Sequence, residues 1–464
     1  MSDRHRTPYD NVLEMVGWTP LVRLDRVTDG CRTPVWGKCE FMNPGGSVKD
    51  RIGLAMIEAA EASGKLHPGG TIVEATSGNT GLALAMAASI KGYHCIFTMP
   101  DKMSSEKVKL LRAFGAEVVI VPTAVPPDHP EHYTVKAKSI AASTPNAVLA
   151  DQFYNPANPE AHYETTGPEL WEQTEGRISH FFAGAGTGGT ITGTARFLKE
   201  KNPEVQICGV DPEGSLIAPF FNTGEMVEGH PYKVEGLGSD KIVDNLDLDV
   251  VDEYVEISDG ASFRMARRLA REEGLFVGGS AGLIVEAAVR KARELDDPDA
   301  CVVAILCDWG ERYLSKLYDD EWMRENGFLD RPRRRSAGDL LGAKDEASSG
   351  LHAVEPTTSV QMALSTMGTH GVSQLPVLLH GECVGSVSES DLMAGVLEDP
   401  ALLDRSAESA MGAPYPVVDA HVDEAEVTRL LTHRAPAVLV RREGRISGIV
   451  TRFDVVRDLT QTRG

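Results

Sequence analysis

The chain has 464 residues and a formal net charge of −22, with 42% hydrophobic and 25% charged residues. This length exceeds one ordinary compact domain, so we expect at least two folded units. The acidic balance disfavours nucleic acid and acidic lipid surfaces as partners. Seven cysteines without CxxC or CxxH spacing indicate neither a complete disulfide framework nor a zinc site.

Residues 1–10 are polar, and no run of apolar residues approaches the length of a membrane span. We therefore expect a cytoplasmic protein that binds no membrane, no nucleic acid and no metal. We further expect small molecules as its partners and a homodimer or homotetramer as its assembly.

Short β-rich runs alternate with helical stretches between residues 16 and 310. The predicted strands are 71–74, 93–99, 117–121, 178–183, 205–210 and 302–306. Predicted helices between them include 81–90 and 105–114. This alternation predicts an α/β fold with mostly parallel sheets, in which ligands bind at the carboxyl ends of the strands.

The composition changes after residue 330, where 331–338 is rich in Arg, Pro and Ser and is predicted to link a first region, 1–330, to a tail. Within the tail, the segment 385–392 resembles the segment 448–455, with Asp391 and Asp454 63 positions apart. This internal repeat predicts a tandem αβ module with units at 339–400 and 401–464.

A lysine follows a glycine turn in the segment Asn-Pro-Gly-Gly-Ser-Val-Lys-Asp-Arg, residues 43–51. The pattern places Lys49 in the first turn of a predicted helix. The positive end of a helix dipole disfavours an ammonium ion, which helps to keep an amine nucleophilic. The alternative is a solvated lysine at a helix start.

Three further turns between a strand and a helix are rich in small residues: 76–81, 184–190 and 277–282. Backbone N–H groups in such turns bind anions, so the first suits a carboxylate and the second a phosphate. Each turn can also be an ordinary helix cap.

The second of these turns also matches GxGxxG through Gly184, Gly186 and Gly189, with Asp211 following after another strand. That spacing is typical of dinucleotide binding, so a nicotinamide oxidoreductase is a competing hypothesis. Against it, the motif lies in the middle of the chain and leaves the other glycine turns unexplained.

Taken together and in this order, the four segments resemble the fold-type II pyridoxal-phosphate enzymes of the cystathionine β-synthase and cysteine synthase group, over residues 16–322. The resemblance implies that Lys49 carries the cofactor and acts as the catalytic base, while Asn79 binds the 3′ oxygen and Ser280 meets the pyridine nitrogen. The residues expected to hold the phosphate are Gly186, Thr187, Gly188, Gly189 and Thr190. Those expected to hold the substrate carboxylate are Thr76, Ser77, Thr80 and Gln152.

Segments 235–240 and 278–282 resemble the cystathionine β-synthases more than the cysteine synthases. This implies a β-replacement in transsulfuration, which condenses L-serine with L-homocysteine to cystathionine. The alternative is a cysteine synthase that uses O-acetylserine and sulfide. Only about 15 residues precede Val16, so the heme-binding extension of the animal enzymes is absent and no heme is expected.

The tail resembles a pair of CBS motifs, a Bateman module, which implies regulation by an adenosyl ligand, with S-adenosylmethionine expected. The residues implied to bind it are Ser388, Asp391, Thr451 and Asp454. They can instead be helix caps in a purely structural module. A chain that only senses nucleotides is also conceivable, but Lys49 is intact and disfavours it.

Overall fold

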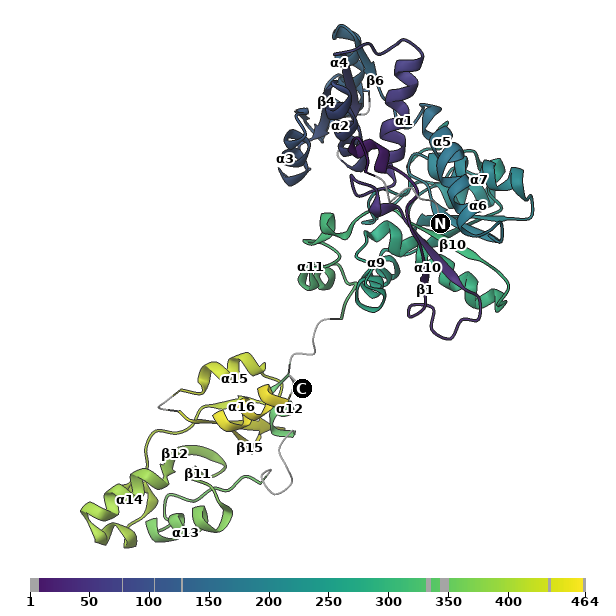
Figure 1. Ribbon diagram of the computed structural model, residues 1–464. Coiled ribbons are helices and arrows are strands. Elements are labelled where there is room, and N and C mark those ends of the chain that lie inside the picture. Colours follow the sequence, from purple (N-terminus) through teal and green to yellow (C-terminus); the bar gives the residue numbers. More distant parts are fainter. Residues whose placement is uncertain are drawn as a thin grey trace. The chain divides into compact units, whose positions relative to one another are not determined.

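The computed structural model describes residues 8–76, 78–103, 105–126, 128–330, 335–342, 350–432 and 435–461. The chain divides into two compact units, residues 1–330 and 331–464 (Figure 1). No helix among the described residues is both long enough and apolar enough to cross a membrane.

The first unit contains a four-stranded parallel sheet in the order β5-β4-β3-β6. Its strands are β3 (Thr71–Ala75), β4 (His94–Pro100), β5 (Glu117–Val121) and β6 (Ala147–Leu149). The helices in this part of the chain are α1 (Lys49–Ala62), α2 (Asn79–Lys91), α3 (Ser105–Ala113) and α4 (Tyr133–Ser143). The strands predicted at 71–74, 93–99 and 117–121 are confirmed. The helix predicted from residue 81 begins two residues earlier, at Asn79.

A second sheet has six strands in the order β1-β2-β10-β7-β8-β9, and β1 alone runs antiparallel to its neighbour. Its strands are β1 (Leu21–Leu24), β2 (Val35–Cys39), β7 (His180–Gly184), β8 (Gln206–Pro212), β9 (Glu253–Ile257) and β10 (Val302–Leu306). The accompanying helices are α5 (Ala157–Ala161), α6 (Gly167–Gln173), α7 (Gly189–Lys201), α8 (Ile217–Thr223), α9 (Asp259–Arg268), α10 (Gly279–Leu295) and α11 (Asp320–Glu325). The predicted α/β fold with parallel-rich sheets is confirmed.

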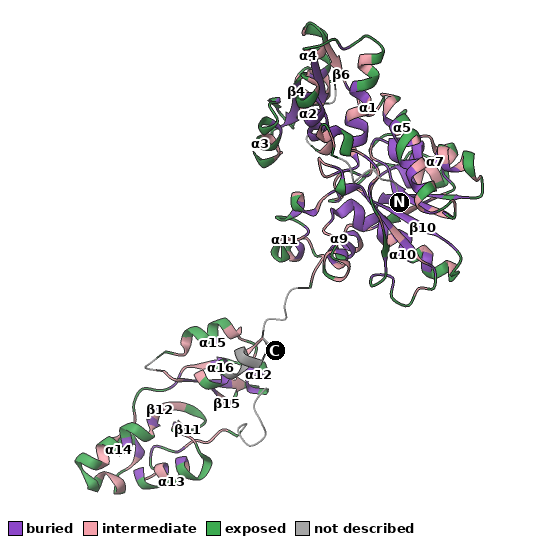
Figure 2. Cartoon of the chain, in the orientation of Figure 1, coloured by how far each residue is buried: buried purple, intermediate pink, exposed green. Residues whose placement is uncertain are grey.

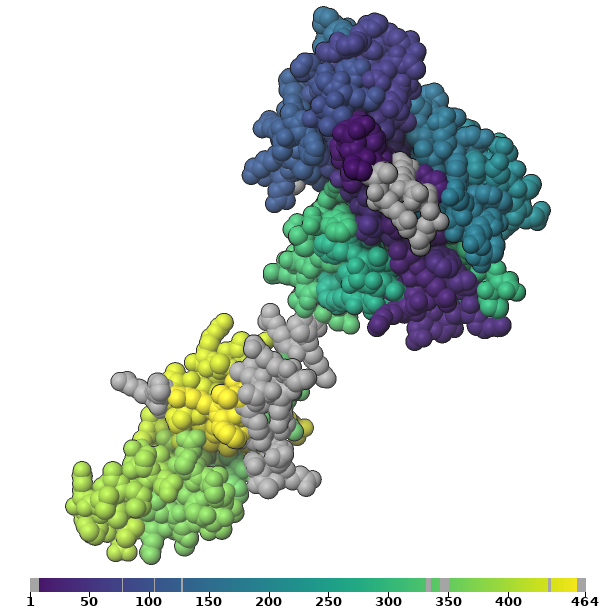
Figure 3. Space-filling model, in the orientation of Figure 1, coloured from purple at the N-terminus to yellow at the C-terminus, as the bar shows by residue number. Residues whose placement is uncertain are grey.

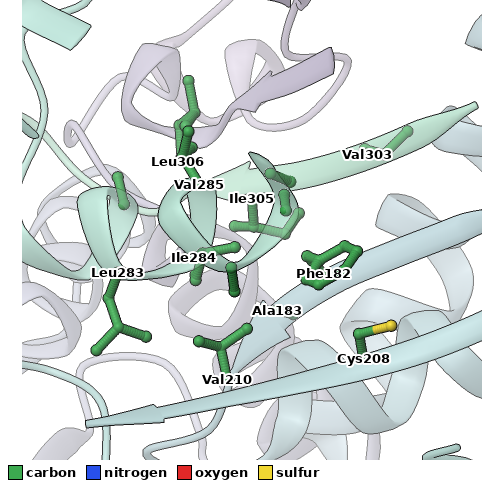
Figure 4. Close-up of a cluster of buried hydrophobic side chains, with 14 of the residues drawn as sticks. Phe182, Ala183, Cys208, Val210, Leu283, Ile284, Val285, Val303, Ile305 and Leu306 are labelled. Atoms are coloured by element: carbon green, nitrogen blue, oxygen red, sulfur yellow. The ribbon is translucent and has the colours of Figure 1, made fainter. Parts of the chain in front are cut away.

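Strand β10 and helix α10 form the centre of this sheet's core. Every residue of β10 is buried, as expected for a parallel strand covered on both faces, and α10 is largely buried as well (Figure 2). Figure 4 shows Ile284 of α10 among the strand side chains Ala183 and Ile305. This packing fixes the N-terminal end of α10 near the carboxyl ends of β7 and β10.

The N-terminal segment of the first unit packs against the part that carries the four-stranded sheet. Leu13, in the short helix η2 (Val12–Met15), belongs to the same apolar cluster as Ile52 and Met56 of α1. In Figure 3 this N-terminal part, coloured purple, is visible between the blue and teal parts of the unit. The segment therefore adds to the apolar cluster that α1 and α2 share.

A buried ion cluster consists of two basic side chains, Lys38 and Arg51, and two acidic ones, Glu40 and Glu169. Arg51 of α1 donates two hydrogen bonds to Glu40 and two to Glu169, each at 2.7 Å. Lys38 Nζ donates to Glu169 Oε2 at 2.7 Å. The four formal charges sum to zero, and no side chain of the cluster is more than 3% exposed. The cluster therefore joins β2, the start of α1 and α6 without a net buried charge.

We predict that Arg51→Met lowers the free energy of unfolding of the first unit by about 3–5 kcal/mol, because it leaves Glu40 buried without its ion-pair partner and Glu169 paired with Lys38 alone. Urea unfolding followed by tryptophan fluorescence measures this, since all five tryptophans lie before residue 331. Arg268→Met is the matched control, because Arg268 pairs with Glu272 at 2.8 Å on the surface, 39% exposed. The control should change stability by less than about 0.5 kcal/mol. Equal losses in both variants would contradict the prediction.

The second unit repeats one αβ pattern. Its first repeat contains α13 (Val360–His370), β11 (Gln374–Leu379), β12 (Glu382–Ser388) and α14 (Glu389–Glu398). The second contains β13 (Val417–Asp419), α15 (Glu424–Leu430), β14 (Ala437–Arg442), β15 (Arg445–Thr451) and α16 (Arg452–Gln461). The strand pairing shifts register after Val377 in one repeat and after Val440, 63 positions later, in the other. The predicted internal repeat therefore extends to the backbone.

The two repeats exchange the segments that precede them. Helix α12 (Ala337–Gly342) comes before the first repeat, but its Leu340 and Leu341 pack in the core of the second. Conversely, Ala407 and Met411 come before the second repeat and pack in the core of the first. The predicted linker 331–338 thus overlaps α12, whose side chains pack in the core of the second repeat. Residues 331–334 lie outside the described residues, and α12 belongs to the folded module.

Candidate active site

A pocket opens where β7 and β10 end and where α1, α7 and α10 begin. Its lining combines the predicted lysine, the predicted anion-binding loop and the start of α10. The lining residues are Val48, Lys49, Asn79, Ala183, Gly184, Gly186, Thr187, Gly188, Thr190, Glu235, Gly236, Leu237, Ser280, Ile284, Ile305, Cys307 and Asp308. The loop at 186–190 follows β7 directly, whereas Lys49 lies well beyond the end of β2, at the start of α1.

Lys49 is the first residue of α1, as predicted, and its side chain faces this pocket. Burial lowers the pKa of the Lys49 amine, while Cys307 and Asp308 act in the opposite direction. A lowered pKa makes the neutral, nucleophilic amine more accessible near neutral pH.

The turn before Lys49 is held from two sides. Its backbone closes with a hydrogen bond from Gly46 N to Asn43 O at 2.8 Å. Arg312 donates to the carbonyl oxygens of Gly45 and Gly46 at 2.8 and 3.0 Å. Asp50 accepts from Gly45 N at 2.5 Å, and burial raises the pKa of this carboxyl to about 7. These contacts fix the entry into α1, and with it the position of Lys49.

The loop from Gly186 to Thr190, called the anion cradle below for its predicted role, lies at the N-terminus of α7. Helix N-termini present free N–H groups and a positive dipole end, and Thr187 and Thr190 add hydroxyls. Asn158 Nδ2 donates to Thr187 Oγ1 at 3.0 Å and to Gln152 O at 2.7 Å, which ties the cradle to the neighbouring loop.

Asp308 is a site residue that sequence reasoning missed. Its Oδ2 accepts from Asn79 Nδ2 at 2.8 Å and from the Tyr313 hydroxyl at 2.6 Å. Burial raises the pKa of this carboxyl. Because one Asn79 amide proton goes to Asp308, the orientation of the amide in the pocket is set. The 229 positions between the two residues left no local pattern to detect.

Ser280 lies in the first turn of α10 and is 4% exposed. Its hydroxyl lowers the pKa of the nearby Cys307 thiol, but burial outweighs this effect and raises that pKa to about 12. Ser280 and Cys307 thus contribute a neutral hydroxyl and a neutral thiol to the pocket lining.

The residues predicted to hold a substrate carboxylate are only partly brought together. Thr80 Oγ1 donates to Gln152 Oε1 at 2.6 Å, and Gln152 Nε2 donates to Glu74 Oε1 at 3.1 Å. Thr76 Oγ1 accepts from Gly78 N at 3.3 Å, within its own turn. Neither Thr76, Thr80 nor Gln152 lines the pocket that holds Lys49. Ser77 lies outside the described residues.

The dinucleotide hypothesis requires Asp211 to meet a ribose, and the structure contradicts that role. Asp211 is fully buried, and its Oδ2 accepts a hydrogen bond from Ala218 N at 3.0 Å. The carboxylate thus holds the turn into α8 and has no face open to a ligand.

The four predicted regulatory residues lie in the second unit, at equivalent turns from strand to helix. Ser388 caps α14 by accepting from Asp391 N at 3.2 Å, and its hydroxyl donates to Asp391 Oδ2 at 2.6 Å. Thr451 donates to Asp454 Oδ2 from its backbone at 2.7 Å and from its hydroxyl at 2.8 Å. In each pair, the two residues are therefore hydrogen-bonded to each other within their own turn.

The donor set of the pocket fits pyridoxal phosphate. A buried amine with a lowered pKa suits an aldehyde, and the start of α7 with two threonine hydroxyls suits a phosphate. All seven cysteines are free. Among the described residues, no group of three or more His, Cys, Asp or Glu side chains can hold a metal ion.

Comparison with known proteins agrees with this geometry. Residues 12–308 match the family model described as pyridoxal-phosphate dependent enzyme, and residues 343–398 and 407–460 match the CBS domain. The chain is 38% identical to cystathionine beta-synthase from Dictyostelium discoideum, covering 98% of this chain and 93% of the relative. It is 44% identical to that from Oryctolagus cuniculus, covering 83% and 71%, and 39% identical to that from Saccharomyces cerevisiae, covering 84% and 82%. The chain therefore belongs to the pyridoxal-phosphate-dependent enzymes, in the cystathionine beta-synthase family with two C-terminal CBS domains.

Proposed function

We propose that the chain condenses L-serine with L-homocysteine to cystathionine by a pyridoxal-phosphate-dependent β-replacement. The observation that carries the proposal is one pocket in which the Lys49 amine faces the anion cradle at the start of α7 and the Ser280 hydroxyl. Relatives named cystathionine beta-synthase, which match most of the chain, support the choice of this reaction.

Each residue has a proposed role. Pyridoxal phosphate, when bound, supplies the electron sink for reactions at the amino-acid carbon. Lys49 holds the cofactor and afterwards moves a proton at the substrate Cα, a role that its buried, lowered-pKa amine suits. Asn79, oriented by Asp308, binds the cofactor's 3′ oxygen.

In this proposal, Ser280 determines how strongly the bound cofactor withdraws electrons. A neutral hydroxyl beside the pyridine nitrogen does not favour a protonated ring as a carboxylate does. The site then favours rapid loss of the β-substituent over side reactions such as transamination.

Product analysis tests the proposal. Full-length enzyme should form cystathionine from serine and homocysteine, and this reaction should exceed cysteine formation from O-acetylserine and sulfide. Lys49→Ala should abolish turnover and the absorbance of the lysine-bound cofactor together, since Lys49 is proposed to supply both functions. Lys65→Ala, an exposed lysine just beyond α1, is the control and should retain both. Normal turnover by Lys49→Ala, or a preference for sulfide, would refute the proposal.

A pH effect follows if Gln152 and Thr80 hold the substrate carboxylate. Burial raises the pKa of Glu74 to about 8, so this acid is neutral below that pH and charged above it. The new charge lies one hydrogen bond from Gln152 and should repel the substrate carboxylate. We predict that the wild-type KM for serine rises about tenfold more between about pH 7 and pH 9 than that of Glu74→Gln.

Steady-state kinetics of both enzymes measure this difference. The titration of serine itself affects both enzymes equally and therefore does not contribute to the difference. Glu117→Gln, which changes an exposed carboxylate of β5, should behave like wild type. If wild type and Glu74→Gln have the same pH profile, Glu74 does not act on the carboxylate site.

We also propose that the second unit binds S-adenosylmethionine through Thr451 and Asp454 and, less strongly, through Ser388 and Asp391. An aspartate carboxylate can accept hydrogen bonds from both hydroxyls of a ribose. The equivalent geometry of the two turns supports equivalent sites. Such a ligand regulates activity or stability only if its affinity differs between two states of the chain.

Calorimetric titration of S-adenosylmethionine into the full-length enzyme tests whether the second unit binds this ligand. We predict saturable binding that Asp454→Ala weakens strongly and that Asp404→Ala, an exposed aspartate of the same unit, leaves unchanged. Absence of binding to the wild type would end the sensor hypothesis.

A cytoplasmic location and a homo-oligomeric assembly complete the proposal. The free cysteines support a reducing compartment. Light scattering on the purified chain measures the assembly.

A further inference from the structure

His162 is a fully buried histidine next to the anion cradle that has no role in the proposed chemistry. Its Nε2 lies 3.2 Å from Thr190 Oγ1, and its Nδ1 lies 2.9 Å from Thr166 Oγ1. Thr166 is also fully buried, whereas Thr190 lines the pocket with Lys49. A continuous chain of three side chains thus runs from the protein interior to the cradle.

Close packing of α7 brings this ring to the cradle. A side chain at Gly193 would collide with the carbonyl oxygen of Pro159 and with His162 Cβ, and one at Gly189 would collide with Asn158. The two glycines therefore allow α7 to lie against α5 and the following π-helical turn η4 (His162–Thr166). π-Helical turns often occur at functional sites.

The ring is neutral, since burial lowers the pKa of His162 to about 3. A neutral imidazole has one donor nitrogen and one acceptor nitrogen. Either Nε2–H donates to Thr190 while the Thr166 hydroxyl donates to Nδ1, or both hydrogen bonds run in the reverse direction.

The two arrangements differ in what Thr190 offers to an anion. In the first, the Thr190 hydroxyl accepts from the ring and keeps its own proton for donation. In the second, that proton is used on Nε2, and Thr190 presents only lone pairs to the pocket, which repel an anion. Anion binding therefore selects the first arrangement.

We propose that His162 is a positioning residue for the cofactor phosphate: it donates from Nε2 to Thr190 Oγ1, and Thr166 holds this tautomer by donating to Nδ1. The proposal rests on the proposed function, because it takes the phosphate of pyridoxal phosphate as the anion in the cradle. It assigns a binding role to Thr166, which does not line the pocket.

Three full-length variants test the relay through the dissociation constant for pyridoxal phosphate. Thr166→Val keeps the shape of the side chain but removes the donor, and should weaken binding roughly 10- to 100-fold. Thr166→Ser retains the hydroxyl and should stay within about threefold of wild type. Thr165→Val is the matched control, because the exposed Thr165 hydroxyl bonds Ala161 O in the same turn and not the ring.

Nitrogen NMR of histidine-labelled wild-type holoenzyme reads the tautomer directly and does not depend on the folding of a Thr166 variant. His162→Gln identifies the His162 signals by their loss. We expect the proton on Nε2. A proton on Nδ1, or equal cofactor affinity of Thr166→Val and Thr165→Val, would overturn the relay. Failure of the wild type to bind pyridoxal phosphate would instead overturn the proposed function on which the relay rests.

Discussion

The position of Lys49 depends on the buried ion cluster two residues further along α1. Arg51 forms ion pairs with two carboxylates, Glu40 just after β2 and Glu169 on α6, each at 2.7 Å. A buried pair of this kind adds little net stability, because desolvation offsets the attraction, but misplacing any partner is costly. The cluster therefore acts as a constraint on geometry. It holds the start of α1 in register with the sheet that carries the anion cradle.

A second constraint is the close approach of backbones around the cradle. A side chain at Gly186 would lie 2.6 Å from the carbonyl oxygen of Gly236, so the loop before α7 touches the loop that holds Glu235. Glu235 pairs with Lys107 of α3 at 3.0 Å and also with Lys316. The pocket is thus enclosed by segments that lie far apart in the sequence.

The sequence predicted the parts of the site that local pattern encodes. Strands of continuous apolar residues, glycine turns and Lys49 after such a turn all depend on neighbours within a few positions, and their placement agrees with the structure. Asp308, Glu74 and His162 were missed because each acts through a partner from another element. The dinucleotide alternative shows that a local pattern can also mislead. Asp211 has the spacing of a ribose-binding residue, but its carboxylate is buried and accepts a hydrogen bond from a backbone amide. The exchange of segments between the two repeats of the tail was also not predicted, because packing there does not follow chain order.

That exchange of segments gives the tail a topological property. Ser336 pairs with Asp423, and Ser406 pairs with Ser359, so each repeat is completed by residues that precede the other. Gly448 leaves room for Leu341, just as Gly385 leaves room for Met411. Neither repeat is therefore an autonomous folding unit. Deletion of one repeat together with the segment before it would remove apolar side chains from the core of the other repeat, so the two repeats can be removed only together.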